Sequence, residues 1–269
     1  MQELKNTKVQ QTIQKMRLKS RHQDSIDNEL LVCQRHKLFY AACSKSACST
    51  IKYLLSCLAT NRQDQQEIRS PHNKKNTGLL GITDLTPENA HQVLFTHNYY
   101  RFAFVRNPFD RVISCFSNRI DKLGLEAYDD ERLAIIQHQE RRLHITQWKK
   151  AGKKTSPETI TFADFIDYIC EQNPKNMDRH WALQSNCIHP DLIKYDHIGR
   201  IENFADDFNH ILKVVKTNGG AFENKLKLNP SSSEKKREEF FTTALEKKFF
   251  EKFKDDFVAF DYPHRLERR

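Results

Sequence analysis

Residues 37–59 constrain the fold most strongly, because three kinds of sequence follow one another there. An apolar run at 38–42 leads into small and polar residues at 43–50, and apolar residues then recur at helical spacing at 51, 54, 55 and 58. This order predicts a strand, a tight loop and a helix. The chain is therefore expected to belong to the α/β class.

The loop in this stretch suits an anion. Backbone N–H groups at a helix N-terminus point outward, and the helix dipole favours negative charge there. Lys45 adds a mobile positive charge, and Ser49 and Thr50 add hydroxyl donors. The small residues between them would let an anion approach the backbone. A helix cap without a ligand is the alternative, and the G-x-x-x-x-G-K-[ST] pattern of nucleoside-triphosphate loops is absent.

Residues 101–123 predict a second strand, turn and helix. The apolar run 102–105 indicates a buried parallel strand, and Asn107-Pro108 ends it. Arg106 leaves the carboxyl end of this strand, where open α/β sheets bind their ligands. Ser114 follows about two helical turns later, so both side chains are expected to meet one anion. Arg111 is expected to pair with Asp110 or Asp121, or to face solvent.

Two such turns, each with a cationic residue, predict two anion sites on one edge of a sheet. That arrangement suits a ligand with two separated phosphate-like groups. At this point the chain resembles the sulfotransferases. SKSACST is similar to their 5′-phosphosulfate loop, and RFAFVRNPFDRVISCFSNRI closely matches their 3′-phosphate motif.

Two further segments extend the resemblance over roughly residues 35–263. HWALQSNCIHPDLIKYDHIGRIENFADDFNHIL resembles a pattern of carbohydrate sulfotransferases of the chondroitin, dermatan and HNK-1 type. The tail, LNPSSSEKKREEFFTTALEKKFFEKFKDDFVAFDY, resembles the closing helices of that family. The resemblance implies a P-loop-like sulfotransferase fold, in which helices flank a central parallel sheet.

The same resemblance implies a donor and its binding residues. The donor would be 3′-phosphoadenosine 5′-phosphosulfate (PAPS), and no metal is needed. Lys45 would neutralise the bridging oxygen as the sulfuryl group leaves, and Arg106 and Ser114 would hold the 3′-phosphate. Ser44 stands where the family usually has proline. The 5′-phosphosulfate would lie on Lys45, Ser46, Ala47, Cys48, Ser49 and Thr50.

Transfer to a hydroxyl also needs a general base, and histidine suits that role near neutral pH. His97 ranks first, because it lies just before the Arg106 strand, near where some glycan sulfotransferases place a catalytic histidine. His180 ranks second, since it belongs to the family-like His-Trp pair. His72 and His189 remain candidates. For each of them the alternative is a structural histidine that donates to a backbone carbonyl.

Composition leaves three classes of function to compare. The 269-residue chain has 44 basic and 35 acidic residues, for a net charge of +9, so it is expected to meet anions. A kinase-like nucleotide-binding enzyme should have a Gly-rich loop and a metal-holding aspartate, which are not found. A nucleic-acid-binding module should show a basic stripe, whereas the basic residues here are scattered. The leading prediction is a PAPS-dependent carbohydrate O-sulfotransferase, with an acidic glycan as one option for the acceptor.

The expected organisation is a polar arm or helix at 1–30, with little core, followed by one sulfotransferase domain at 31–269. Within it, 124–160 is expected to be a helical insertion near the acceptor cleft, or a surface hairpin. Further predictions are helices starting at Thr86 and Thr161, a strand at 192–198, a helix at 202–215 and a last helix with buried phenylalanines.

The cysteines and the absence of apolar segments suggest a location. The seven cysteines show no metal-ligand spacing and are expected to be reduced and mostly buried. No stretch reaches membrane-spanning length, and residues 1–20 contain no apolar signal core. The expectation is a cytoplasmic, soluble enzyme of bacterial type, unless the chain was truncated from a Golgi-anchored parent.

Overall fold

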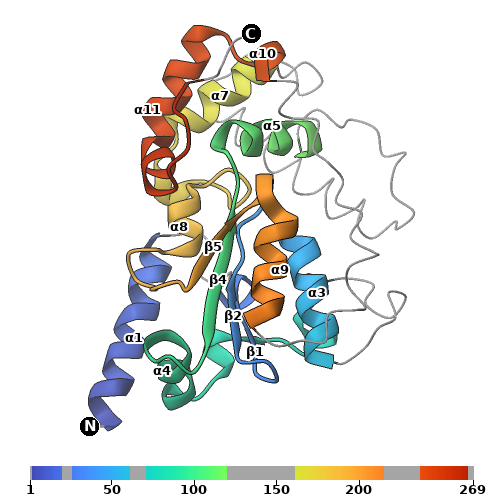
Figure 1. Ribbon diagram of the computed structural model, residues 1–269. Coiled ribbons are helices and arrows are strands. Elements are labelled where there is room, and N and C mark those ends of the chain that lie inside the picture. Colours follow the sequence, from blue (N-terminus) through green and yellow to red (C-terminus); the bar gives the residue numbers. More distant parts are fainter. Residues whose placement is uncertain (1, 20–25, 61–70, 120–160, 215–236, 266–269) are drawn as a thin grey trace.

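A computed structural model describes residues 2–19, 26–60, 71–119, 161–214 and 237–265. In this part of the chain a five-stranded mixed sheet has helices on both faces, so the predicted α/β class is confirmed (Figure 1). The strands follow the order β3-β1-β2-β4-β5. Their bounds are Leu30–Cys33 for β1, Leu38–Ala41 for β2, Leu80–Gly81 for β3, Tyr100–Val105 for β4 and His197–Arg200 for β5.

The sheet is parallel only in part. Strands β2, β4 and β5 pair in parallel, whereas β1 is antiparallel to both β2 and β3. The prediction of a central parallel sheet is therefore correct for three strands and wrong for β1 and β3. The reason is local: a short turn at 34–37, with a positive φ of 52° at Lys37, joins β1 to β2. A connection this short permits only an antiparallel pair.

The predicted strand at 192–198 is displaced toward the C-terminus. Residues 189–196 form turns instead, and the N–H groups of Leu192 and Ile193 both donate to the His189 carbonyl. The hydroxyl of Tyr195 donates to the Ile188 carbonyl. These local bonds occupy the segment, so that β5 begins only at His197.

The two predicted strand-to-helix units are confirmed. Helix α3 follows β2 and helix α5 follows β4. Thr86 caps α4 by accepting from the N–H of Asn89, and Thr161 caps α7 by accepting from the N–H of Asp164. The helices are α1 Gln2–Lys19, α2 Ile26–Glu29, α3 Cys48–Thr60, α4 Pro87–Phe95, α5 Pro108–Arg119, α7 Phe162–Glu171, α8 Gln184–Ile188, α9 Phe204–Val214, α10 Arg237–Phe240 and α11 Thr243–Ala259. Short 3-10 helices are Lys74–Asn76, Ile82–Asp84, Pro174–Asn176 and Ile201–Asn203.

Alternate residues of each central strand face two separate cores. Tyr40 and Phe104 pack with α3 and α9 on one face. Phe39 and Val105 pack on the other face, together with α1, α4, α5, α7, α8 and α11. In Figure 1, α5, α7, α10 and α11 gather beyond the carboxyl end of β4, so the predicted ligand-binding edge is flanked by helices.

The N-terminal segment contributes to the core, contrary to expectation. Val9 and Met16 of α1 are buried, and Leu30 is already part of β1. The reason is that α1 packs along α4 rather than standing apart. The predicted insertion at 124–160 lies outside the described residues.

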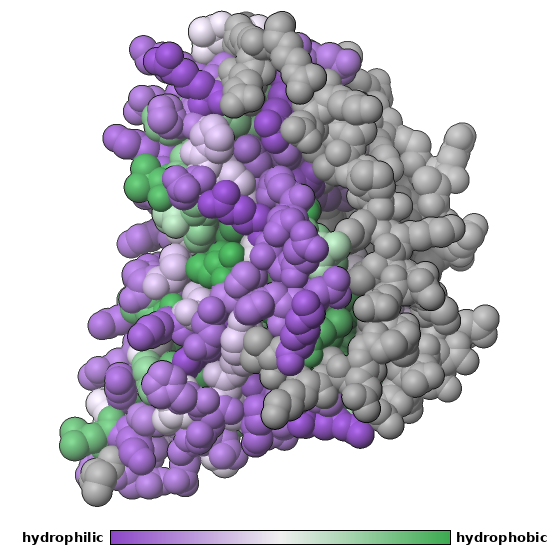
Figure 2. All heavy atoms as spheres, in the orientation of Figure 1, coloured by the Kyte–Doolittle hydropathy of each residue, from purple (hydrophilic) through white to green (hydrophobic). Residues whose placement is uncertain are grey.

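The described surface is mainly polar. The face in Figure 2 is largely hydrophilic, with apolar residues in smaller areas. Leu4, Leu18 and Val258 are the large hydrophobic side chains exposed in the described part. Among the described helices, none has the length and apolar character needed to cross a membrane. The described cysteines are free thiols, and five of the seven are buried.

Candidate active site

The first turn, residues 42–47, connects β2 to α3 at the carboxyl edge of the parallel strands. Lys45 and Ala47 both adopt left-handed backbone conformations, with φ of 67° and 54°, on either side of Ser46. Alternation of left-handed and ordinary residues turns successive N–H groups toward one side and forms an anion-binding concavity. The N-terminus of α3 follows directly at Cys48. The helix N-terminus therefore favours an anion here, whereas within the turn itself the Ser46 N–H already donates to the Cys43 carbonyl at 3.3 Å.

The side chains of the first turn point in different directions. Ser46 is fully buried, and its hydroxyl donates to Oε1 of Gln184 at 3.3 Å. Ser49 is exposed, and its Oγ lies 2.9 Å from Nε2 of His72. Both donors of Ser46 are therefore engaged within the protein, since its N–H donates to the Cys43 carbonyl at 3.3 Å, whereas Ser49 presents its hydroxyl at the surface. Lys45, Ala47, Cys48 and Thr50 are partly buried.

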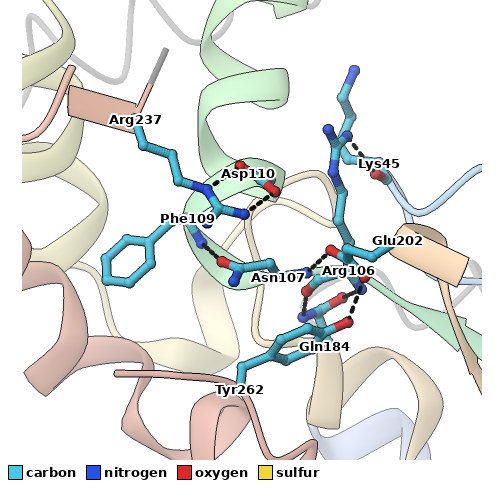
Figure 3. A network of polar contacts seen from close by, with 9 residues as sticks. All are labelled: Lys45, Arg106, Asn107, Phe109, Asp110, Gln184, Glu202, Arg237 and Tyr262. Atoms are coloured by element: carbon cyan, nitrogen blue, oxygen red, sulfur yellow. Dashed lines mark hydrogen bonds and ion pairs between the residues drawn. The ribbon is translucent and has the colours of Figure 1, made fainter. Parts of the chain in front are cut away.

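The second turn, Arg106–Asn107, connects β4 to α5 and is held by side chains from elsewhere (Figure 3). The Arg106 N–H donates to Oε1 of Gln184 at 2.9 Å, and the Gln184 amide donates to the Arg106 carbonyl at 2.8 Å. The Asn107 N–H donates to Glu202 at 2.7 Å. Asn107 in turn accepts from the N–H of Phe109 in the first turn of α5.

The Arg106 side chain extends from the second turn to the first. Its Nη1 donates to the Lys45 carbonyl at 3.3 Å (Figure 3), and only 5% of the residue is exposed. Burial lowers the pKa of the guanidinium, while the charges of Asp110 and Glu202 raise it. The structure therefore brings Lys45 and Arg106 together. Ser114 lies partly buried on α5, and its role in holding the 3′-phosphate stays a prediction.

Arg111 behaves differently from its prediction. It is 3% exposed, and its guanidinium donates to three carbonyls: Ser44 at 3.0 Å, Ala182 at 2.7 Å and Arg179 at 3.3 Å. It neither faces solvent nor pairs with Asp110, and Asp121, the other predicted partner, lies outside the described residues. The Asp110 carboxylate instead accepts two bonds from Arg237, at 2.7 and 2.5 Å. Adjacent helical residues point in different directions, which explains why Arg111 and Asp110 separate.

The predicted histidines lie in different places. His97 is exposed in the turn before β4, at the opposite end of that strand from Arg106. Six strand residues span about 20 Å, so the structure does not bring His97 to the two turns. We therefore correct its first rank among the candidate bases.

His180 lies in the segment 179–182, and Arg111 donates both to this segment and to the Ser44 carbonyl. It is 7% exposed, and its Nδ1 lies 2.6 Å from Oδ1 of Asp178. Arg111 bonds the carbonyls of Arg179 and Ala182, which flank His180. A carboxylate beside Nδ1 fixes the proton there in the neutral ring, so that Nε2 carries the basic lone pair.

His72 is the histidine that the sequence reasoning underestimated. It is exposed and contacts Ser49 of the first turn, although the residues around it read as a surface loop. His189 caps the end of α8 and is buried, and burial together with the charge of Lys19 lowers its pKa to about 4. A buried histidine with so low a pKa is a weak base near neutral pH, so His189 is poorly suited to remove the proton of the hydroxyl that receives the sulfuryl group.

Two residues were quoted in the motifs without a role. Gln184, from HWALQ, touches both turns. Glu202, from GRIEN, holds Asn107 and accepts from the Tyr262 hydroxyl at 2.9 Å. Their position within the motifs was the available signal. Among the described residues, no group of three or more histidine, cysteine or acidic side chains is placed to hold a metal; that no metal is used stays a prediction.

The fold defines an α/β protein with two adjacent strand-to-helix turns that each carry a cationic residue, and comparison with known proteins gives the family. A model of the sulfotransferase family matches residues 28–263. The chain belongs to this family. The kinase-like and nucleic-acid-binding alternatives are not favoured.

Individual relatives agree with this assignment. Carbohydrate sulfotransferase 14 of Danio rerio is 30% identical over 69% of this chain and 48% of its own length. Carbohydrate sulfotransferase 11 of Rattus norvegicus is 27% identical over 87% of this chain and 66% of its own. Carbohydrate sulfotransferase 8 of Mus musculus is 27% identical over 71% and 44%. The chain spans about half the length of the curated relatives it matches first, and no solved structure matches it.

Proposed function

We propose that this protein transfers a sulfuryl group from PAPS to a hydroxyl of a carbohydrate. The observation that carries the proposal is the contact between the two turns, in which Arg106 of one donates to the Lys45 carbonyl of the other. PAPS has two anionic ends, and family membership makes a sulfate donor the expected ligand. The similar proteins are carbohydrate sulfotransferases, which makes a carbohydrate the expected acceptor.

The first turn would hold the 5′-phosphosulfate. The N–H groups at the start of α3 would face the anion, and the Lys45 ammonium would neutralise the oxygen that bridges sulfur and phosphorus as that bond breaks. Arg106 and Ser114 would hold the 3′-phosphate. Catalysis would then consist mainly of positioning and charge stabilisation.

His72 is our choice for the general base. It is exposed, so that an acceptor hydroxyl can reach it, and it contacts Ser49 at the start of α3. His180 is the second candidate, because Asp178 orients its ring and Arg111 holds its segment against Ser44. In either case the base removes the hydroxyl proton while the oxygen attacks sulfur in line with the leaving phosphate.

The net charge of +9 favours acidic acceptors over neutral ones. The test is transfer of labelled sulfate from PAPS to a panel of neutral and acidic polysaccharides. We expect Lys45→Ala to lower the transfer rate by about 100-fold or more, because it removes the charge at the leaving oxygen. We expect His72→Asn to lower it by about 100-fold.

His97→Asn is the matched control, since it changes an exposed histidine at the other end of β4. A larger loss in His180→Asn than in His72→Asn would move the base to His180. A purified protein that does not bind PAPS would contradict the donor. Transfer to non-sugar hydroxyls alone would contradict the acceptor class.

A further inference from the structure

One buried side chain contacts both anion-binding turns. Gln184, the first residue of α8, is 0% exposed. Its Oε1 accepts from the Arg106 N–H at 2.9 Å and its Nε2 donates to the Arg106 carbonyl at 2.8 Å (Figure 3). The same Oε1 accepts from the Ser46 hydroxyl at 3.3 Å. Gln184 thus bonds the backbone of the second turn and a side chain of the first.

We propose that Gln184 is a positioning residue that fixes the spacing between the two turns and thereby the distance between the two anions that the protein binds. The inference rests on the proposed function, because a donor with phosphate groups at both ends of its ribose is the ligand that this spacing would serve. Gln184 itself is too buried to touch the donor.

The chemistry of this position calls for a primary amide. The Arg106 peptide unit presents one N–H donor and one carbonyl acceptor, and the Gln184 amide pairs with both in one planar group. Glutamate can accept but, when ionised, cannot donate, and an apolar side chain can do neither. Because the site is buried, any group left without its partner carries the full cost of desolvation.

Gln184 is itself held firmly from behind. Its own N–H donates to Asp256 at 2.7 Å, and the N–H and hydroxyl of Ser185 both donate to the same carboxylate at 2.9 Å. Asp256 belongs to α11 and is 0% exposed. The support therefore runs from α11 through Gln184 to the two turns, and the amide has little freedom to follow a displaced turn.

This arrangement predicts a selective effect on ligands that bridge the turns. A nucleotide with one phosphate needs one turn in its correct shape. A nucleotide with two phosphates also needs the correct spacing, because its second contact depends on the effective concentration that the first one creates. Loss of the Gln184 amide should therefore weaken a bisphosphate more than either monophosphate.

The test is calorimetric titration with adenosine 3′,5′-bisphosphate, adenosine 3′-phosphate and adenosine 5′-phosphate. In Gln184→Ala and in the near-isosteric Gln184→Glu we expect the bisphosphate to bind about tenfold more weakly or worse, and each monophosphate to change by less than about threefold. Ser46→Ala removes one bond between Gln184 and the first turn and leaves the Cys43 thiol donating to Oε1 at 3.8 Å, so it should give the same pattern with a smaller loss. It also covers the case in which the Gln184 variants do not fold.

Gln172→Ala is the matched control. The Gln172 amide accepts from the Trp181 indole N–H at 2.8 Å, so its loss also removes a side-chain hydrogen bond, but it touches neither turn. We expect all three nucleotides to bind this variant as they bind the wild type. Equal losses for all three nucleotides in Gln184→Ala would show a merely structural role and overturn the inference.

A second measurement separates this inference from the proposed function. If the wild type binds no bisphosphate, the donor assignment fails, and amide hydrogen exchange on the unliganded protein then decides the role of Gln184. We expect Gln184→Ala to speed exchange in residues 43–49 and 105–108 together, and Gln172→Ala to leave both unchanged. Faster exchange in one turn only, or in neither, would overturn the coupling.

Discussion

The two turns at the carboxyl edge of the sheet occupy equivalent places, yet they are built in different ways. The β2–α3 turn takes its shape from its own backbone, with left-handed conformations at Lys45 and Ala47. The β4–α5 turn, Arg106–Asn107, has no positive φ and is shaped by bonds to distant side chains. An anion-binding turn can thus be formed by local conformation or by remote support, and the two kinds should respond to different substitutions.

The two turns also offer different groups to an anion. The first presents N–H groups and the Lys45 ammonium, whereas the second presents the guanidinium of Arg106, a residue that is only 5% exposed. A buried guanidinium is fixed in direction and recognises a phosphate by geometry. A partly exposed lysine can follow a group that moves during a reaction. This difference fits a site in which one anion stays bound and the other changes.

The largest expected effect concerns a link between the turns. Arg111 lies on the helix after the second turn but donates to Ser44 of the first, and also to Ala182 and Arg179. Arg111→Met leaves three carbonyls without this donor. We expect it to lower the free energy of unfolding by about 4 kcal/mol, as measured by urea denaturation.

The exposed Arg35 provides the control, since Arg35→Met should change stability by no more than about 0.5 kcal/mol. Similar losses in both variants would mean that Arg111 does not bind the first turn to the second, and the two turns would then have to be treated as independent.

The next prediction concerns the 3′-phosphate that the second turn is proposed to hold. Arg106→Ala should lower the affinity for adenosine 3′,5′-bisphosphate by about 100-fold, as measured by calorimetry, which is equivalent to about 3 kcal/mol of binding free energy. Arg106→Lys should lose about tenfold, because lysine keeps the charge but not the planar fork. Adenosine 5′-phosphate, which needs only the first turn, should bind all three proteins alike. A comparable loss of the 5′-phosphate would show that the turns do not divide the ligand as proposed.

The difference between the turns also explains what the sequence could predict. Both strand-to-helix units follow from local signals, namely an apolar run, a break and an apolar stripe. The groups that complete the site come from far away: Gln184 is 138 residues from Ser46 and 78 from Arg106. Asp110 accepts a hydrogen bond from Arg237, which is 127 residues away in the sequence, and not from the neighbouring Arg111. Pairings over such distances depend on tertiary packing and leave no local pattern.

The histidines show that closeness in the sequence does not predict closeness in the structure. His97 is close to Arg106 in sequence, but β4 lies between them and places them at opposite edges. His72 is much farther from Arg106 along the chain, yet it contacts the first turn. Proximity in sequence therefore misleads wherever a whole strand intervenes.

The dependence of the second turn on α8 can be probed from the far end of that helix, at His189. Burial lowers the pKa of His189 to about 4, below its usual 6.5. Between these values the unfolded chain binds a proton that the folded chain excludes, so stability falls as the pH falls. We expect this residue to account for about 2 kcal/mol of the stability lost between pH 7 and pH 5.

His189→Asn removes this titration and tolerates the left-handed φ of 52°. Urea denaturation at the two pH values should show a shallower loss in the variant than in the wild type. His97→Asn, at an exposed position, should keep the wild-type profile. Parallel profiles for the wild type and His189→Asn would mean that His189 does not titrate as its burial requires.

The smallest effect tests the local origin of the first turn. Ala47 holds a φ of 54°, which costs an L-residue about 1–2 kcal/mol, whereas glycine adopts it freely at an entropic cost of about 0.5–1 kcal/mol. Ala47→Gly should therefore stabilise the protein by about 0.5 kcal/mol in urea denaturation. Ala244→Gly, at an exposed helical position in α11, should destabilise it by about 0.5–1 kcal/mol. Opposite signs for one chemical change would show that the backbone of the first turn sets its own shape; a loss at Ala47 equal to that at Ala244 would mean that this turn, like the second, is held from outside.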